Sequence, residues 1–482
     1  MRAGSNYLAA LSDQRAIHLG GERVEDVASH PAFAPIAHRV AELFDLAAAP
    51  GSGMTCVDPG TGEETNRVFV APRSRADLAA FREAVLTWAH HHHGWVGRGP
   101  DHVGAFLAAF AAHPEAFDGD EHQFGANVLA YHRRVQREHR YVAYAIIPPQ
   151  FSRAVTAHAW DDEPVQAAIV AQGPDGVVVR GAQMLATGGA VADDLFVSCI
   201  KPLSPEDRDF ALSFVVPVGT PGLRFHCRRP YAPAASSGYD YPLSTRYDET
   251  DALVVFDDVL VPWDQVFVCR DVAGLQRQFF ATGAHQLGNW QAQLRFSVKL
   301  QFIAGLARKV AQVNEIDRFP GVIEKLGELA SIASLVESAV IAAEQTAEPD
   351  AAGLWRPGAR ALYGAMGLQS ELYPRALGIL RELAGGGVLQ VPASVRDLRD
   401  PVARADLDRY VRSPKTDAEQ RIKLFKLVWD VVGSEFGGRH QQYEMFYAGA
   451  PFVARNYAFR NYGFDAPLAT VDAFLDSYDA VA

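Results

Sequence analysis

Histidine and cysteine are the side chains in this sequence whose types suggest metal or redox chemistry. The run from His90 to His93 resembles a metal cluster, but consecutive residues of a helix point in different directions and make a poor chelate. The cysteines are scattered and contain no C-x-x-C pair: Cys56, Cys199, Cys227 and Cys269. This spacing excludes a disulfide scaffold and the common zinc frameworks. We therefore expect no metal site, and a solvated or loop-packing role for the histidine run.

The motifs that bind nucleotides or activate a nucleophile are also missing from the sequence. It contains no G-x-x-x-x-G-K-[ST] phosphate loop and no complete G-x-G-x-x-G that opens a strand–helix unit. The metalloprotease motif H-E-x-x-H and the hydrolase motif G-x-S-x-G are absent too. A redox enzyme with this sequence would not bind NAD(P)H through a Rossmann site, so its electrons would arrive by another route.

The composition is typical of a soluble globular protein. Of 482 residues, 49% are hydrophobic and 21% charged, and 45 basic against 57 acidic residues give a net charge of −12. This acidic balance argues against nucleic-acid binding, which needs a basic surface. The first residues lack the long apolar segment of a secretory signal, and no run of 18 apolar residues indicates a membrane span. We expect a cytoplasmic protein with no nucleic-acid or membrane partner.

The sequence pattern changes twice along the chain and predicts three domains. Residues 1–142 have mainly helical patterns, with Ala- and Leu-rich segments at 76–89 and 103–112. Residues 143–272 contain short β-branched and aromatic runs separated by Gly, Pro and Asp, which predict a mostly antiparallel sheet or barrel. From 273 to 482 the helical period returns, and several long apolar helices predict a bundle that packs against other subunits. The expected fold class is α+β.

Short segments in a fixed order carry a resemblance that covers nearly the whole chain. They are 21–24 with 30–33, 97–101 (GRGPD), 145–150 (AIIPPQ), 181–187 (GAQMLAT), 241–249 with 256–263, and 438–449. Each segment is weak evidence alone, but the order and the spacing are specific together. The chain resembles the 4-hydroxyphenylacetate 3-hydroxylase family, the oxygenase components of two-component flavin-dependent monooxygenases.

The resemblance implies a fold, a cofactor and a reaction. The fold is similar to that of acyl-CoA dehydrogenases: an N-terminal helical domain, a middle antiparallel β domain and a C-terminal four-helix bundle that assembles as a homotetramer. The family takes FAD in its reduced form, FADH2, from a separate NAD(P)H:flavin reductase, in agreement with the missing nicotinamide motif. With O₂ it forms a flavin C4a-hydroperoxide and hydroxylates a phenolic or related electron-rich ring in the ortho position. A free phenol, a halophenol, an indole-like ring and a carrier-tethered aromatic amino acid all fit the sequence.

The same resemblance implies four catalytic candidates. Arg98, in the segment 97–101, is the cation that favours a phenolate, because an opposite charge lowers a phenol's pKa. The family has a Tyr directly after P-D and a His directly before A-x-x-P-P-Q, whereas here His102 and Tyr144 occupy these positions. We predict an acid–base or phenolate-stabilising role for His102 and a donor role for Tyr144; alternatively, the exchange only reshapes the pocket for another substrate. His285 is predicted to hydrogen-bond the peroxide or the flavin, and the alternative is a structural role.

Flavin contacts are implied for two further parts of the chain. The cofactor-binding candidates are Gln150, Phe151, Ser152, Arg153, Thr187, Phe446, Tyr447, Ala448 and Gly449. A β-domain loop that ends in Thr187 is suited to hydrogen-bond the polar edge of an isoalloxazine, and Arg153 to contact a pyrophosphate oxygen bidentately. The alternative is ordinary loop packing.

Two other functions are alternatives to the hydroxylase. A dehydratase of the 4-hydroxybutyryl-CoA type needs an iron–sulfur cluster held by Cys and His, and the scattered cysteines offer no such group. A non-catalytic oligomer that keeps the fold would bind neither flavin nor phenol. The resemblance favours the flavin-dependent hydroxylase.

Overall fold

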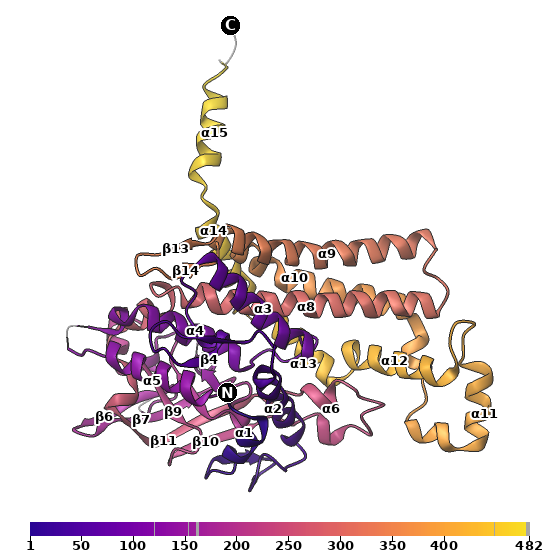
Figure 1. The fold of residues 1–482 in the computed structure, drawn as a ribbon, viewed down its shortest axis with the longest axis horizontal. Coiled ribbons are helices and arrows are strands. Elements are labelled where there is room, and N and C mark those ends of the chain that lie inside the picture. Colours follow the sequence, from indigo (N-terminus) through magenta and orange to yellow (C-terminus); the bar gives the residue numbers. More distant parts are fainter. Residues whose placement is uncertain (120, 153, 161–162, 448, 479–482) are drawn as a thin grey trace.

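The computed structural model describes residues 1–119, 121–152, 154–160, 163–447 and 449–478. Helices come first along the chain, then most of the strands, then a second set of helices (Figure 1). The N-terminal helices are α1 (Gly4–Ala10), α2 (Ala34–Ala48), α3 (Arg75–His91), α4 (Pro100–Ala112) and α5 (Gly125–Glu138). The start of α4 follows from its sequence, because Pro100 occupies the first turn, where its missing N–H costs nothing, and Asp101 adds an acidic group there.

Two sheets form the β layer. One has the order β2-β1-β10-β11-β7-β6 and the other β12-β9-β8-β5. The strands are β1 (Ala16–Leu19), β2 (Glu22–Arg23), β5 (Val142–Ala145), β6 (Ala168–Gly173), β7 (Gly176–Gln183), β8 (Asp194–Val197), β9 (Leu212–Pro217), β10 (Leu223–Cys227), β11 (Ala252–Pro262) and β12 (Val266–Cys269). Pairing in these two sheets is antiparallel except between β1 and β10 and between β5 and β8.

The N-terminal segment also contributes to this β layer. Strand β1 pairs with β10, and β2 extends the same edge, in a part of the chain that the sequence predicts to be mainly helical. Both strands are very short, and such short runs carry too little alternation to be distinguished from loops. The expected domain boundaries fall at the first residues of β5 and of α7 (Val272–Phe280).

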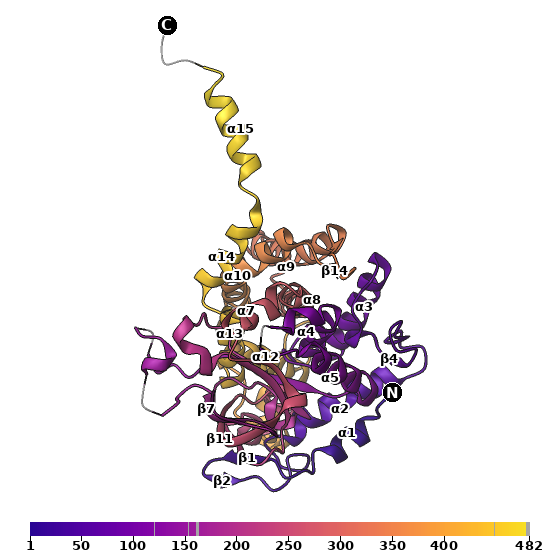
Figure 2. The same cartoon turned by 90° about the vertical axis from the view of Figure 1, so that its left-hand side faces the viewer.

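The C-terminal helices form a bundle. Helices α8 (Ala284–Val313), α9 (Pro320–Gln345) and α10 (Ala359–Ala384) lie side by side in both ribbon views (Figures 1 and 2). The remaining helices are α6 (Ser244–Tyr247), in the loop before β11, and α11 (Pro401–Tyr410), α12 (Ala418–Val432), α13 (Glu435–Phe446), α14 (Pro451–Tyr462) and α15 (Asp465–Leu475). The short pairs β3 (Thr55–Val57) with β4 (Glu64–Asn66) and β13 (Glu348–Pro349) with β14 (Trp355–Arg356) lie outside the main sheets.

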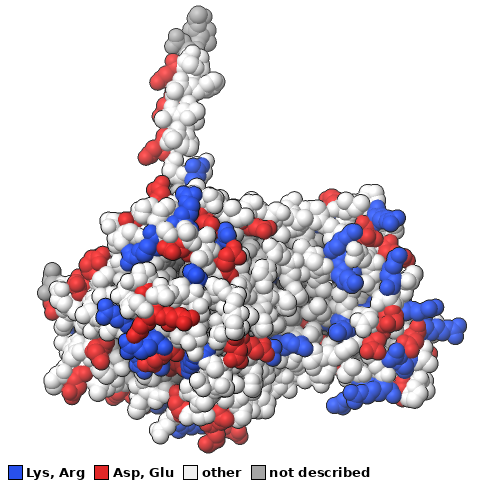
Figure 3. Space-filling view, viewed as in Figure 1, with Lys and Arg blue, Asp and Glu red and all other residues white. Residues whose placement is uncertain are grey.

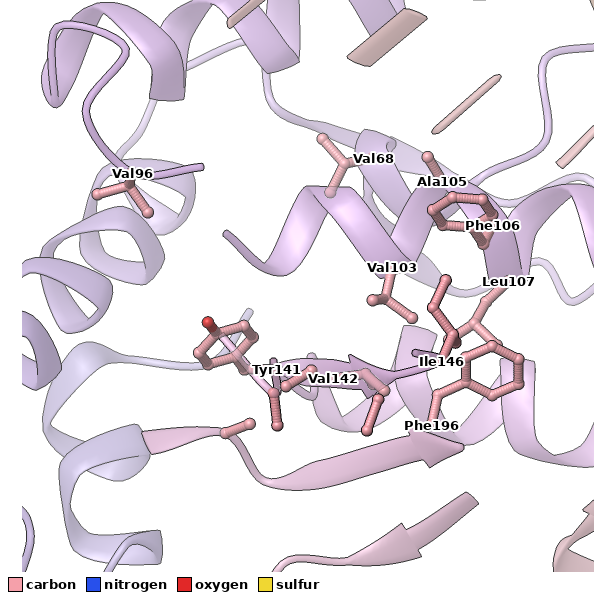
Figure 4. Packing of buried hydrophobic residues seen from close by; sticks show 14 of the residues in the cluster. Val68, Val96, Val103, Ala105, Phe106, Leu107, Tyr141, Val142, Ile146 and Phe196 are labelled. Carbon is pink, nitrogen blue, oxygen red and sulfur yellow. The ribbon is translucent and has the colours of Figure 1, made fainter. Parts of the chain in front are cut away.

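A continuous apolar core joins the first helices to the β layer. Val103 and Leu107 of α4 lie close to Val142 of β5 and Phe196 of β8 (Figure 4), and all four side chains are buried. Burying such side chains stabilises a fold by about 1.5–3 kcal/mol each. This packing fixes α4 against β5, and therefore fixes the candidates on these two elements relative to each other.

Helix α9 differs from its neighbours in its exposed apolar surface. It is the one helix in the described ranges that is long and apolar enough to cross a membrane, with a mean hydropathy of 1.6, and 28% of that stretch is buried. Core helices of soluble proteins meet the same criterion. Its exposed side chains include Ile323, Leu335 and Ile341. Helix α9 therefore presents an apolar face that the single chain leaves uncovered.

We predict that the hairpin between β6 and β7 depends on Gly176 and not on Gly173. A Cβ at Gly176, which has φ +152°, would lie 2.0 Å from the carbonyl oxygen of Val261, whereas a Cβ at Gly173 would meet nothing within 4 Å. Gly176→Ala should lower the free energy of unfolding by about 2 kcal/mol or more, because the strand β11 must move away. Denaturant unfolding of both variants measures this difference. Equal stabilities for Gly176→Ala and the control Gly173→Ala would contradict it.

Candidate active site

Arg98 lies in the connection between α3 and α4, and both its backbone N–H and its backbone carbonyl make hydrogen bonds to side chains. Glu249 accepts hydrogen bonds from the backbone N–H of Gly97 (2.8 Å) and of Arg98 (2.7 Å), while the Tyr141 hydroxyl donates to the Arg98 carbonyl (2.7 Å). Gly97 is needed here, because a Cβ would lie 2.4 Å from the Tyr443 hydroxyl. These contacts hold the Arg98 backbone between the first helices, the β layer and α13.

The guanidinium of Arg98 is surrounded by rings. Its Nη1 lies 2.7 Å from Nε2 of His102, and its central carbon lies 4.4–5.3 Å from three tyrosine ring centres. These tyrosines are Tyr144, Tyr443 and Tyr447. Ring faces attract a cation but do not neutralise its charge. Within the described ranges the Arg98 guanidinium has no carboxylate within ion-pair distance, so it is available to an anion.

The side chains around Arg98 keep part of their surface accessible. Arg98, Tyr144, Tyr443 and Tyr447 are each half-buried, although they face one another from three different segments of the chain. The Tyr443 hydroxyl is itself buried and has no hydrogen-bond partner in the described structure. A polar, partly accessible cluster deep in the molecule is suited to hold a small molecule.

His102 links Arg98 to two further buried residues. Its Nδ1 lies 3.1 Å from Oε1 of Gln291, whose Nε2 donates to Asp101 at 2.7 Å. Burial and the neighbouring Arg98 hold the pKa of His102 well below its usual value, so the ring is neutral at neutral pH. Burial raises the pKa of Asp101 to about 6, against the hydrogen bond from Gln291 that lowers it.

The exchanged residues face each other. The rings of His102 and Tyr144 have centroids 5.3 Å apart and planes inclined by 31°. The chain therefore has the same two side-chain types in contact that the family pattern predicts, with their positions on α4 and β5 interchanged. Burial raises the pKa of Tyr144, with Arg98 acting in the opposite direction. Tyr144 keeps its proton at neutral pH.

A buried charged cluster holds α13, which carries Tyr443 and ends directly before Tyr447, against α8. Glu444 of α13 accepts two hydrogen bonds from Arg295 (2.5 and 2.8 Å) and one from Lys299 (2.6 Å), both residues of α8. Burial raises the pKa of Glu444, but Arg295 and Lys299 lower it more, to about 2. Burial lowers the pKa of Lys299 to about 7. Removing one partner from such a cluster leaves an uncompensated buried charge.

The predicted flavin contacts lie on loops that the sheet brings together. An isolated bridge pairs Ile147 with Met184, which places the loop of Gln150 and Ser152 beside the loop of Thr187. The Thr187 hydroxyl donates to Asp251 (2.6 Å), so its oxygen remains able to accept a hydrogen bond. Arg439 of α13 donates to the same carboxylate (2.7 Å).

The exposed side chains on these loops fit a flat ring system. Phe151 is 55% exposed and Leu185, at φ +62°, is 53% exposed. Phe446, at the end of α13, is 44% exposed, and Gly449 follows at φ +90°. An isoalloxazine needs apolar side chains against its ring faces and hydrogen-bond acceptors for its N–H groups. The exposed apolar side chains and the Thr187 oxygen meet both needs, so the residues present fit a flavin. Tyr447 lies in the Arg98 cluster, and the predicted contacts Arg153 and Ala448 lie outside the described residues.

His285 is placed apart from Arg98. Its Nδ1 lies 2.9 Å from the Tyr363 hydroxyl, and its ring packs against Phe280 and Tyr457. These residues line a cavity of about 280 Å³. In the described structure His285 makes no hydrogen bond or ring contact with Arg98, His102 or Tyr144. Burial lowers the pKa of His285 to about 4.

The histidine run at the end of α3 has ordinary packing contacts. His91 pairs with Glu42 (3.1 Å), and Nδ1 of the buried His92 accepts the backbone N–H of Val96 (3.2 Å). Among the described residues no group of three or more His, Cys, Asp or Glu is arranged to hold a metal ion. The contacts of His91 and His92 are those of a surface pair and of a packed loop.

Sequence reasoning did not identify Gln291, Tyr443 or Glu249 as site residues. A signal for Gln291 exists in α8, where Asn289, Gln291 and Gln293 are polar side chains that alternate with apolar ones, and all three are buried. Buried polar side chains are informative because each one needs a partner. The partners lie on distant segments, and the sequence does not show which segments meet.

We predict that His285 makes the protein sensitive to acid. Its pKa is about 4 in the folded chain against 6.5 for an ordinary histidine, so the unfolded chain binds the proton first as the pH falls. Stability should be lost from pH 6.5 downward, by about 2.5 kcal/mol at pH 4.5. Denaturant unfolding at pH 7.5 and 4.5 should show a smaller acid loss for His285→Gln than for the native chain. Equal losses would contradict a buried neutral His285.

Comparison with known proteins agrees with this geometry. Models of the 4-hydroxyphenylacetate 3-hydroxylase N terminal and C terminal match residues 3–268 and 275–476. The pyoverdin chromophore biosynthetic protein PvcC of Pseudomonas aeruginosa is 36% identical over 93% of this chain and 89% of its own length. The 4-hydroxyphenylacetate 3-monooxygenase oxygenase component of Escherichia coli is 35% identical over 99% of this chain and 93% of its own.

Solved structures confirm the predicted fold. The oxygenase component HpaB of 4-hydroxyphenylacetate 3-monooxygenase, complexed with FAD and 4-hydroxyphenylacetate, is 32% identical with a TM-score of 0.94 over 99% of both chains. A 4-hydroxybutyryl-CoA dehydratase from N. maritimus has a TM-score of 0.90 at 19% identity, over 100% of this chain and 96% of its own, and shares the fold alone. The helical, β and helical-bundle architecture is confirmed, and this chain belongs to the 4-hydroxyphenylacetate 3-hydroxylase family.

Proposed function

We propose that the protein is the oxygenase component of a two-component, FADH2-dependent monooxygenase that hydroxylates a phenolic or related electron-rich ring in the ortho position. The observation that carries the proposal is the Arg98 guanidinium, held by backbone contacts among aromatic rings and without a carboxylate partner in the described structure. Relatives of the family are named as oxygenase components, and one was solved with FAD and a phenol.

Arg98 stabilises the substrate as a phenolate. The tyrosines around Arg98 are neutral, so an ionised phenol oxygen of the substrate supplies the negative charge that pairs with the guanidinium. The positive charge of Arg98 in turn lowers the pKa of the phenol. A phenolate is the more electron-rich ring, and its ortho carbon is the more nucleophilic. A guanidinium N–H that donates to the phenolate oxygen also orients the ring, because a charge-assisted hydrogen bond is short and directional.

His102 orients the Arg98 guanidinium, whereas Tyr144 contacts the phenolate oxygen. His102 is neutral, and its Nε2 accepts from Arg98, so it directs the guanidinium. Tyr144 keeps its proton and is available to donate to the phenolate oxygen. Of the two roles predicted for His102, this arrangement favours stabilisation of the phenolate over transfer of a proton.

The flavin contacts are proposed for Gln150, Phe151, Ser152, Thr187, Phe446 and Gly449, together with Arg153 and Ala448. When bound, the reduced flavin supplies the two electrons that activate O₂, so that one oxygen atom enters the ring and the other leaves as water. Thr187 accepts a hydrogen bond from the ring system, and Phe151 and Phe446 cover it. Exclusion of water by these side chains protects the activated oxygen. A separate reductase is proposed as the source of electrons, since the chain has no Rossmann motif.

We predict that Arg98→Ala abolishes hydroxylation and leaves the binding of reduced FAD unchanged. Loss of a positioned charge at the reacting oxygen should lower turnover by roughly 10²-fold or more. Product formation from a phenol panel with an added flavin reductase, and anaerobic titration with reduced FAD, measure the two effects. Arg375→Ala, at an exposed arginine paired with Glu328, is the control. Unchanged turnover in Arg98→Ala would remove Arg98 from the mechanism.

We also propose that the protein assembles as a homotetramer through its exposed apolar helices. Helix α15 projects away from the rest of the chain in both ribbon views (Figures 1 and 2). In Figure 3 its acidic residues lie along one side and most of its surface is uncharged. Its exposed apolar side chains are Leu468, Val471, Phe474 and Leu475. The exposed apolar side chains of α15 and of α9 are of the kind that marks protein–protein interaction sites.

Charges on the apolar side of α15 should weaken assembly. Leu468→Asp/Phe474→Asp places two carboxylates where a second copy of the chain would pack, so a smaller particle is expected in size-exclusion chromatography with light scattering. The control Asp465→Ala/Asp472→Ala changes the charged residues of the same helix and should keep the native size. Identical sizes for both double variants would show that α15 is no part of the interface.

A further inference from the structure

A chain of hydrogen bonds runs from Asp101 to Arg98 through two side chains. Gln291 Nε2 donates to Asp101 Oδ2 (2.7 Å), Gln291 Oε1 faces His102 Nδ1 (3.1 Å), and His102 Nε2 faces Arg98 Nη1 (2.7 Å). Asp101, His102 and Gln291 are buried, at 5%, 1% and 2% exposure. Water therefore does not substitute for a missing partner in the first two links.

The direction of each hydrogen bond follows from the groups at the two ends. An ionised carboxylate only accepts, so Asp101 requires the amide nitrogen of Gln291. The amide oxygen of Gln291 then faces His102, and because this oxygen only accepts, Nδ1 of His102 must carry the proton. A neutral imidazole has one proton, so Nε2 is bare. A guanidinium only donates, and the bare Nε2 is the acceptor that Arg98 Nη1 requires.

We propose that Gln291 and Asp101 are positioning residues that fix His102 in its Nδ1–H tautomer and thereby hold the Arg98 guanidinium in place for a phenolate. This inference rests on the proposed function for the role of Arg98. It assigns no contact with substrate to Gln291 or Asp101, which act through His102. The other tautomer would direct an N–H at the guanidinium N–H groups, and Arg98 would turn away.

The need for this pair follows from the imidazole at position 102. A tyrosine hydroxyl at that position rotates and presents either its proton or a lone pair to a neighbour. An imidazole has no such freedom, because the tautomer decides which nitrogen accepts. The positive charge of Arg295 on α8 also acts on the hydrogen-bond chain, because it lowers the pKa of both Asp101 and His102. This charge favours the ionised carboxylate and the neutral ring that the arrangement requires.

The tautomer of His102 can be measured without substrate or flavin. In the full-length protein labelled with ¹⁵N-histidine, the His102 resonances are those that disappear in His102→Phe. We expect a protonated Nδ1 and a bare Nε2 at pH 7.5 in the native protein. Gln291→Met removes both hydrogen bonds, and Asp101→Asn allows the Gln291 amide to reverse. Both variants should show a mixture of tautomers or the Nε2–H form.

A matched control separates the proposed effect from the loss of any buried glutamine. Gln278→Met removes a fully buried glutamine that donates to Ser198 (2.6 Å) on another part of the fold, and it should leave His102 as in the native protein. A native His102 with its proton on Nε2 would overturn the proposal. So would a native tautomer in both Gln291→Met and Asp101→Asn.

A chromogenic phenol tests the consequence for Arg98. The absorbance of bound 4-nitrophenol reports its ionisation, and we expect its pKa to rise by about one unit, a tenfold change in the equilibrium, in Gln291→Met and Asp101→Asn relative to native and Gln278→Met. A variant with a changed tautomer and an unchanged phenol pKa would overturn the link from His102 to Arg98. If the native protein did not lower the pKa of bound 4-nitrophenol, the proposed function would fail, whereas the tautomer measurement would stand by itself.

Discussion

A cation without a neutralising partner imposes the main constraint on this site. The Arg98 guanidinium is half-buried, and its neighbours in the described structure are a neutral imidazole and tyrosine rings. Burial opposes its charge, but the tyrosines favour it, and its pKa ends above the usual value, so Arg98 stays charged. A permanent charge in an incompletely solvated site favours binding of an anion. None of the described side chains supplies this anion to Arg98, so the substrate is the group expected to supply it.

The other contacts around Arg98 are explained by the need to keep this charge in one place. Glu249 binds the backbone of Gly97 and Arg98 rather than the guanidinium, and its ion-pair partner in the described structure is Arg439 (3.5 Å). The Glu249 carboxylate thus fixes the main chain of Arg98 and leaves the Arg98 guanidinium without an ion pair in the described structure. The buried cluster around Glu444 has the same effect at α13, since it fixes the helix that presents Tyr443 and Tyr447. Such clusters contribute little to stability, and we infer that this one is retained for positioning.

The sequence predicted the parts of the site that lie in short continuous segments. Arg98 lies just before α4 and His102 lies in its first turn, four residues further on, and Tyr144 lies directly before a recognisable motif. These three residues are therefore predictable from the sequence, and they do meet in space. Gln291 and Tyr443 were not identified, because their roles depend on which faces of α8 and α13 turn toward residues 97–102. Strands β1 and β2 were not predicted for a related reason, because the few residues of each strand do not show that β1 pairs with β10 and β2 with β1.

The exchange between His102 and Tyr144 has a consequence for the proton of the substrate. A histidine beside a phenol is an obvious base, yet here burial and Arg98 keep its pKa well below the usual value, and its Nε2 already accepts from Arg98. Tyr144 holds its own proton. Neither side chain is thus placed to take the phenol's proton at neutral pH. The phenol must then lose its proton to water or enter the site already ionised. The protein contributes the positive charge of Arg98, which favours binding of the ionised form.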